Sequence, residues 1–204
     1  MPRPATTDTR KRLLAAARAE FSEHGLAGAR VDRIAAAAGC NKERIYANFG
    51  SKDGLYEVVF ADCVTEIRAA TPHDASDPGA YVGKIFDFHA RHPHLIRMLV
   101  WEGLQCTPDT VPDAAERRAM YQERMETLAA ALGIPPGPEA SRLLFVLFGL
   151  AGWPHAMPVM GSLITNGESS TEEGRLALRD FIADFTRKAL RQNTDTVSGN
   201  VSGL

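Results

Sequence analysis

The chain has 204 residues, of which 45% are hydrophobic and 24% are charged, and its formal net charge is −2. This composition is typical of a soluble globular protein with a buried core, and it excludes a polycationic protein. The charge is unevenly placed, because residues 1–52 carry 10 Lys and Arg against 5 Asp and Glu, whereas residues 53–204 carry a net charge of −7. We therefore expect that only the N-terminal part contacts a polyanion.

Three features bear on the compartment. Cys40, Cys63 and Cys106 are widely spaced, which argues against a disulfide framework and favours a reducing, cytoplasmic location. The first residues, MPRPATTDTRKR, hold no apolar run, so we expect no secretory leader. Residues Leu143–Thr165 lack Asp, Glu, Lys and Arg, but Gly and Pro interrupt them. We interpret this segment as a core or interface helix that ends near Pro154, and we expect no membrane partner.

Helical periodicity runs along the chain, and the alternation typical of strands is nearly absent, which predicts an all-α fold. In the N-terminal part we expect helices over Thr9–His24 (ending at Gly25), Val31–Ala38, Lys42–Asn48 and Lys52–Ala70, the last capped by Ser51. In the remainder we expect helices over Ala80–Arg91, His94–Leu104, Asp113–Leu132, Glu139–Trp153 and Thr171–Gln192, the last with Ser170 and Glu173 as a capping box. A polar loop is expected around Thr71–Gly79.

The helices expected at Val31–Ala38 and Lys42–Asn48 are joined by Gly39, which is typical of a helix-turn-helix. Glycine allows the left-handed turn, and the four alanines before it let the helices approach closely. With Ile45 and Phe49 facing inward, the second helix presents an outward face made of Glu43, Arg44 and Ala47, flanked by Tyr46. Such a helix can enter the major groove of DNA.

Four motifs follow one another between Thr9 and Val59: Leu-x-x-x-Ala…Phe…Gly, V-D-R-I-A-x-x-A-G, N-K-x-x-I-Y-x-x-F and S-K-x-x-L-Y. Together they resemble the DNA-binding domain of the TetR (tetracycline-repressor) family. The rest of the chain resembles that family in length and helical character. The resemblance implies an N-terminal three-helix DNA-binding domain over 1–52, a larger helical effector-binding and dimerisation domain over 53–192, and a flexible tail over 193–204.

The resemblance also implies roles for individual residues. Lys42 and Arg44 would reach the groove at the start of the recognition helix, and Tyr46 and Lys52 resemble the family's phosphate contacts. Two arginines beside the second helix would neutralise backbone charge, although a purely solvated role is the alternative. The predicted DNA contacts are Arg30, Arg33, Lys42, Glu43, Arg44, Tyr46, Ala47, Asn48 and Lys52.

Family members open a cavity for a small effector in the helical body. Here the candidate lining residues are Met98, Trp101, Glu102, Gln105, Tyr121, Phe145 and Phe148. Glu102 and Gln105 would orient the ligand through hydrogen bonds. The alternative is that the methionines and aromatic residues form plain core.

Metal and catalytic sites are not expected. His89, His92 and His94 form the only possible metal cluster, and because Pro93 disrupts their spacing we favour a solvated connector. The sequence has no nucleotide-binding glycine motif, no H-E-x-x-H and no G-x-S-x-G. We therefore expect no cofactor, no metal and no enzymatic activity.

A dimer is expected because the helix Glu139–Trp153 is apolar on nearly every face, including Leu147 and Phe148. Paired with the apolar stripe of the last helix (Leu178, Phe181, Ile182 and Phe185), it would form a four-helix bundle across a two-fold axis. The sequence thus predicts a homodimeric repressor of a palindromic operator, released by a small-molecule effector. Two alternatives stay open. One is a helical protein, either a carrier of lipophilic ligands or an enzyme, that kept the N-terminal fold. The other is an architectural DNA binder without an effector.

Overall fold

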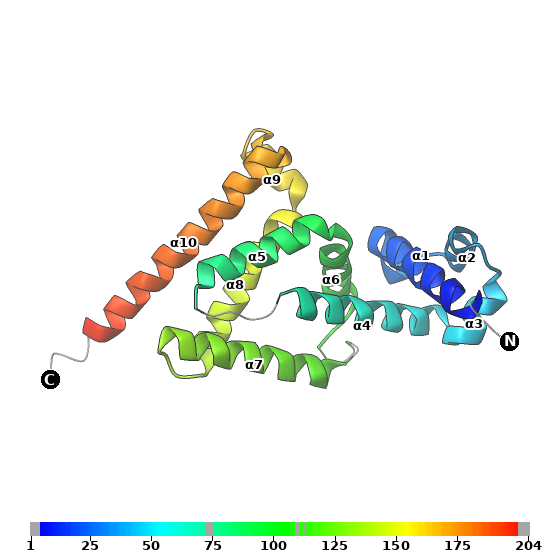
Figure 1. The fold of residues 1–204 in the computed structure, drawn as a ribbon, viewed down its shortest axis with the longest axis horizontal. Helices are drawn as coiled ribbons and strands as arrows, with labels where there is room; N and C mark the ends of the chain where they lie inside the picture. The colour runs from blue at the N-terminus through cyan, green and yellow to red at the C-terminus, as the bar shows by residue number, and fades with distance from the viewer. Residues whose placement is uncertain (1–4, 72–75, 109–110, 112, 200–204) are drawn as a thin grey trace. The chain divides into compact units, whose positions relative to one another are not determined.

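The computed structural model describes residues 5–71, 76–108, 111 and 113–199. Within these ranges the chain forms helices and no strand (Figure 1), which confirms the all-α fold class. Residues 72–75 of the predicted loop and 200–204 of the predicted tail lie outside the described residues. The chain divides into two compact units, the first made of residues 1–69 and 92–114 and the second of residues 70–91 and 115–204.

The first unit is built from the N-terminal helices and one later helix. Its elements are α1 (Ala5–Gly28), α2 (Val31–Ala38), α3 (Lys42–Phe49), α4 (Lys52–Ala70) and α6 (Pro93–Gln105). Helix α1 packs against both α2 and α6. The core of this unit contains Phe21 and Tyr56, whose rings meet edge to face with centroids 5.2 Å apart. This compact unit therefore extends beyond residues 1–52.

A break in α1 lies at the glycine where the sequence predicts the helix to end. Gly25 has φ 64° and ψ 179°, which interrupts the helical path, and α1 then continues to Gly28. A Cβ atom at residue 25 would lie 2.8 Å from the ring of Trp101, so this position requires glycine for space as well as for conformation. The predicted start at Thr9 is four residues late, because the helix begins at Ala5.

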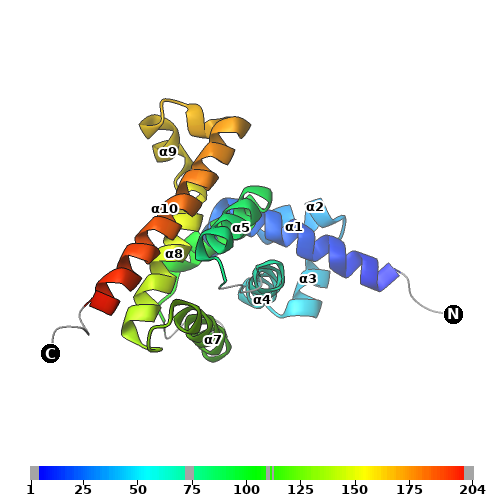
Figure 2. The same cartoon turned by 60° about the vertical axis from the view of Figure 1, so that its left-hand side comes forward.

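The second unit packs around α5 (Pro78–Arg91). Figures 1 and 2 show α5 beside two longer helices, α8 (Pro138–Ala156) and α10 (Glu172–Gly199), and α5 contacts both. Helix α7 (Ala114–Leu132) adds to the same core, which includes Tyr81, Val82, Phe86, Met125, Leu128, Ala140, Leu144, Leu147, Ala151 and Ile182.

Several boundaries of the second unit differ from the prediction. Helix α8 passes through Pro154 and ends at Ala156, and α9 (Pro158–Ile164) was not predicted. Helix α10 is capped by Thr171, whose Oγ1 accepts from the N–H of Gly174 at 3.0 Å, so the predicted Ser170 capping box is wrong by one residue. The backbone of α10 is helical as far as Gly199.

The segment Leu143–Thr165, which lacks Asp, Glu, Lys and Arg, lies in two helices and not in one continuous helix. Among the described residues, no single helix has the length and apolar character needed to cross a membrane. Helices α8 and α9 pass that test only as a pair, and the chain bends by 86° between them.

Candidate DNA-binding surface

The helix-turn-helix forms as the sequence predicts. Gly39 takes the left-handed conformation, φ 65° and ψ 41°, and ends α2. Asn41 caps α3, because its side chain accepts from the backbone N–H of Arg44 at 3.2 Å. Ile34 and Ile45 are fully buried and fix how the two helices cross. The predicted cap of α4 is confirmed, since Ser51 Oγ accepts from the N–H of Gly54 at 2.9 Å.

The outer face of α3 is exposed and carries a free guanidinium. Glu43, Arg44, Ala47 and Asn48 are all exposed, as is Tyr46. Asn48 donates to the carbonyl oxygen of Arg44 at 2.6 Å. Within the part of the chain that the structure describes, the Arg44 guanidinium makes no hydrogen bond or ion pair. It can therefore bind a ligand without breaking an existing contact.

Two of the predicted DNA contacts, Lys42 and Arg33, are already paired within the protein. Lys42 forms a hydrogen-bonded ion pair with Asp32 of α2, and the hydrogen bond to Asp32 raises the pKa of Lys42. Arg33 holds Glu20 of α1 through its Nε at 2.7 Å and its Nη2 at 2.6 Å. Burial favours a higher pKa for Glu20, but the bonds from Arg33 and from the backbone N–H of Arg30 outweigh it and hold that pKa below its usual range.

The remaining predicted contacts lie at the ends of this surface. Lys52, at the start of α4, is half-buried and donates from Nζ to the carbonyl oxygen of Ala29 at 3.3 Å. The side chain of Arg30 is exposed next to α2. Both residues share the first unit with α3, and their predicted phosphate contacts stay predictions.

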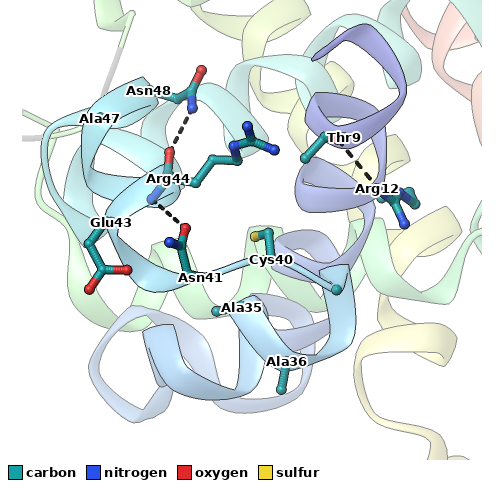
Figure 3. A pocket seen from close by; sticks show the side chains of 11 residues that line it. Thr9, Arg12, Ala35, Ala36, Cys40, Asn41, Glu43, Arg44, Ala47 and Asn48 are labelled. Atoms are coloured by element: carbon teal, nitrogen blue, oxygen red, sulfur yellow. Dashed lines mark hydrogen bonds between the residues drawn. The ribbon is translucent and has the colours of Figure 1, made fainter. Parts of the chain in front are cut away.

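The structure adds residues of α1 that the sequence analysis missed. A hollow between α1, α2 and α3 is lined by Thr9, Arg12, Ala35, Ala36, Gly39, Cys40, Asn41, Glu43, Arg44, Ala47 and Asn48. In Figure 3 the Arg44 side chain extends from α3 toward α1, whereas Glu43 points away from it. The basic run Arg10-Lys11-Arg12 was the available signal for this contribution.

The candidate effector residues are divided between the two units. Met98 and Glu102 are buried in the first unit, where Trp101 donates from Nε1 to the carbonyl oxygen of Ser22 at 3.3 Å. Gln105 is exposed at the end of α6. The structure therefore packs Trp101 onto the C-terminal part of α1.

The other three candidates lie in the second unit, and the ring of one of them, Phe148, lies beside a buried arginine. Tyr121 and Phe148 have ring centroids 6.2 Å apart, and the Arg124 guanidinium lies 5.9 Å from the Phe148 centroid. Arg124, which sequence reasoning missed, is 7% exposed and donates to Tyr81 Oη at 2.9 Å. Burial raises the pKa of Tyr81, and Arg124 partly opposes that shift. The third candidate, Phe145, is 80% exposed on α8.

Two of the three histidines of the predicted connector lie together, although Pro93 stands between them. Pro93 is the first residue of α6, a position that tolerates proline, so His92 and His94 lie together with ring centroids 6.0 Å apart. Glu66 of α4 lies beside them, with Oε1 3.3 Å from His92 Nδ1. His89 is buried in the second unit, its ring centroid 6.2 Å from that of His155.

Comparisons with known proteins match both parts of the chain. Residues 13–59 match the family model for bacterial regulatory proteins of the tetR family, and residues 77–188 match that for the tetracyclin repressor-like C-terminal domain. The HTH-type transcriptional repressor SCO4008 of Streptomyces coelicolor is 35% identical over 186 residues, which cover 88% of this chain and 94% of that protein.

Two further proteins support the same assignment. The HTH-type transcriptional repressor NicS of Pseudomonas putida is 34% identical over 104 residues, which cover 47% of this chain and 49% of that protein. The crystal structure of the putative transcriptional regulator SCO4942 from Streptomyces coelicolor superposes with a TM-score of 0.75 and 31% identity, covering 89% of this chain and 97% of that one. These two family models, together with relatives of 35% and 31% identity that the chain covers almost completely, show that the chain belongs to the TetR family and is a DNA-binding transcriptional regulator.

Proposed function

We propose that the protein is a homodimeric repressor that binds a palindromic operator through α3 and is released by a small-molecule effector. The observation that carries the proposal is the exposed face of α3 with its unpaired Arg44, next to the hollow lined by Thr9 and Arg12 of α1. A guanidinium in the first turn of a recognition helix fits the two acceptors of a guanine edge. Operator DNA is therefore the proposed partner of this face.

The ion pairs of Lys42 and Arg33 suggest that different residues of this surface contact the bases and the phosphates. Lys42 and Arg33 are offset by Asp32 and Glu20, so each adds less net attraction to phosphate than an unpaired cation does. Arg33 also donates to the carbonyl oxygen of Gly28 at 3.0 Å and fixes the connection between α1 and α2. We assign base recognition to Arg44, and backbone contacts to Arg30, Tyr46 and Lys52.

A second copy of the chain is the proposed occupant of an apolar face on the second unit. Exposed large apolar side chains occur on α8, on α9 and on α10, and together they are more than a monomer of this size usually leaves in water. The family assignment favours an isologous contact between copies, with a recognition helix from each. The exposed residues of this face are Phe145, Val146, Trp153, Met157, Val159, Met160, Leu163, Ile164, Leu176, Phe181 and Phe185.

The effector is proposed to bind in the helical body. Support comes from the interior of the second unit, where the Arg124 guanidinium lies between Tyr81 and the ring of Phe148. A mostly apolar site with a few fixed polar groups is the usual form of a small-ligand pocket. We propose binding without a catalysed reaction, in the cytoplasm, where operator DNA is located.

The experiment that tests the DNA proposal compares two charge-removing variants in fluorescence anisotropy with the DNA upstream of the protein's own gene. Arg44→Ala should weaken binding by about 1–3 kcal/mol per half-site. Arg91→Ala removes the same charge from an exposed position on α5, outside α3 and the proposed dimer face, and should leave the affinity unchanged. Equal losses from both variants would mean that α3 is not the reading surface.

A further inference from the structure

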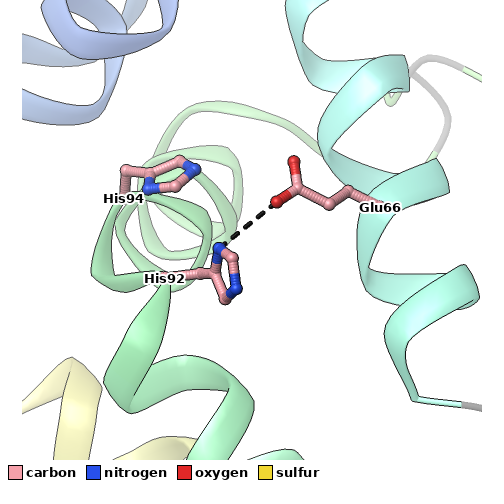
Figure 4. A group of neighbouring side chains, drawn as sticks. All are labelled: Glu66, His92 and His94. Carbon is pink, nitrogen blue, oxygen red and sulfur yellow. Dashed lines mark ion pairs between the residues drawn. The ribbon is translucent and has the colours of Figure 1, made fainter.

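Three potential metal ligands converge in the first unit, outside the DNA-binding surface. Glu66 of α4 faces His92 and His94 at the start of α6 (Figure 4). One ligand atom from each lies within 4.8 Å of the others, and all three side chains are half-buried. We propose that this group binds a single divalent transition-metal ion of the zinc type.

The donor set determines which ions fit. Two imidazole nitrogens and one carboxylate oxygen are ligands that Zn²⁺ and its neighbours in the transition series prefer, whereas Mg²⁺ prefers oxygen alone. Ligands at about 2.1 Å from a tetrahedral ion lie about 3.4 Å apart, so the three groups must close by roughly an ångström. Their partial exposure leaves room for that movement, and a water molecule would complete the fourth position.

The group already attracts a positive charge from the protein itself. Arg18 of α1 places Nη1 2.6 Å from Glu66 Oε2 and 3.4 Å from His94 Nε2. A guanidinium and a metal ion cannot share this place, because two positive charges so close repel each other strongly. Metal binding must therefore displace Arg18 from Glu66.

An alternative partner for the displaced arginine lies close by. Asp62 precedes Glu66 by one turn of α4, and it lines a hollow of about 600 Å³ together with Arg18 and His94. The side chain of Arg18 is 28% exposed, so it can rotate within this hollow toward Asp62. On metal binding, the metal ion thus replaces the Arg18 guanidinium beside Glu66 and His94. Arg18 therefore competes with the metal ion for this site.

The test uses the full-length protein after removal of any histidine tag, titrated with Zn²⁺ against a chromophoric chelator. We expect one ion per chain, and His92→Ala and His94→Ala should each weaken binding at least about tenfold, because even the loss of a residue that only orients a metal ligand costs that much. Arg18→Met keeps the aliphatic stem but removes the competing charge, so it should tighten binding. His24→Ala is the matched control, because His24 pairs with Glu20 in the same unit and should not change the affinity.

Titration with Co²⁺ separates the proposed site from the cysteines. We expect visible absorption typical of nitrogen and oxygen ligands and no sulfur-to-cobalt charge-transfer band, and Mg²⁺ should not compete. Circular dichroism of each variant establishes that it is folded. The proposal is overturned if no ion binds, if a thiolate band appears, if both histidine variants bind like the wild type, or if Arg18→Met fails to tighten binding.

Discussion

The guanidinium of Arg124 donates a hydrogen bond to the phenolic oxygen of Tyr81 at 2.9 Å inside the second unit. The same arginine donates from Nη2 to the carbonyl oxygen of Thr71 at 3.2 Å, so one buried cation joins α7, α5 and the residue that follows α4. A buried charge is tolerated where its donors are satisfied in this way.

This arrangement predicts a large loss of stability on removing the arginine. Arg124→Met removes the hydrogen bonds from Arg124 to the Tyr81 hydroxyl and the Thr71 carbonyl, so the free energy of unfolding should fall by about 2–4 kcal/mol. Arg142→Met, at an exposed position on α8, should change it by less than about 0.5 kcal/mol. Urea denaturation followed by circular dichroism measures both, and similar stabilities would contradict the structural role of Arg124.

The thiol of Cys63 should resist alkylation in the folded protein. Burial among apolar side chains raises its pKa to about 11, so the reactive thiolate is scarce at pH 8. Cys40, which lines the hollow beside α3, and Cys106 are both half-exposed and should react before Cys63. Mass mapping after brief iodoacetamide treatment checks the order, with guanidinium-unfolded protein as the control in which all three cysteines react. Early modification of Cys63 would contradict its burial.

Dimerisation should depend on the outward side of the apolar helices. Phe181 is 67% exposed on α10, and Phe181→Glu should yield folded monomers, because a carboxylate would be buried in the proposed interface. Leu147, which the sequence analysis placed at the interface, is 3% exposed and belongs to the core of its own unit, so Leu147→Glu should prevent folding instead. Ala130→Glu, at an exposed position on α7, is the control. Sedimentation equilibrium distinguishes these outcomes, and a folded Phe181→Glu dimer would place the interface elsewhere.

The helix-turn-helix could be predicted because its signals are local. The apolar residues spaced at helical intervals around Ile34 in α2 and around Ile45 in α3, and Gly39 between the two helices, predict where each helix lies. Helix α9 was missed because seven residues between Met157 and Thr165 contain too few turns to show a period.

Groups that depend on packing could not be predicted from spacing. Glu66 and His92 are 26 positions apart in the sequence, and only the packing of the first unit brings them together. Arg124 lies in a polar stretch, RRAMYQERMET, where a solvated charge is the natural interpretation. The apolar stripe of α10 also divides, since Ile182 faces the core and Phe181 faces outward.

The proposed effector response makes a thermodynamic prediction. An effector found by thermal-shift screening should bind the free protein more tightly than the operator-bound protein, by the same factor by which it weakens operator binding. A coupling free energy of about 1–3 kcal/mol corresponds to a factor of roughly 5–150. Calorimetric titration with and without saturating operator measures this factor. Equal affinities would exclude release by that compound and favour the architectural alternative.

Selection of operator sequences from random duplex DNA, by the wild type and by Arg44→Ala and Lys52→Ala in parallel, tests the central claim most directly. The account predicts a palindrome bound by two chains, with one base position in each half-site relaxed by Arg44→Ala. Lys52→Ala should select the same palindrome, but the slope of log affinity against log salt concentration should become shallower by about one per half-site. Enrichment of no common sequence, or the same sequence preference in wild type and Arg44→Ala, would contradict the assignment of α3 as the reading helix.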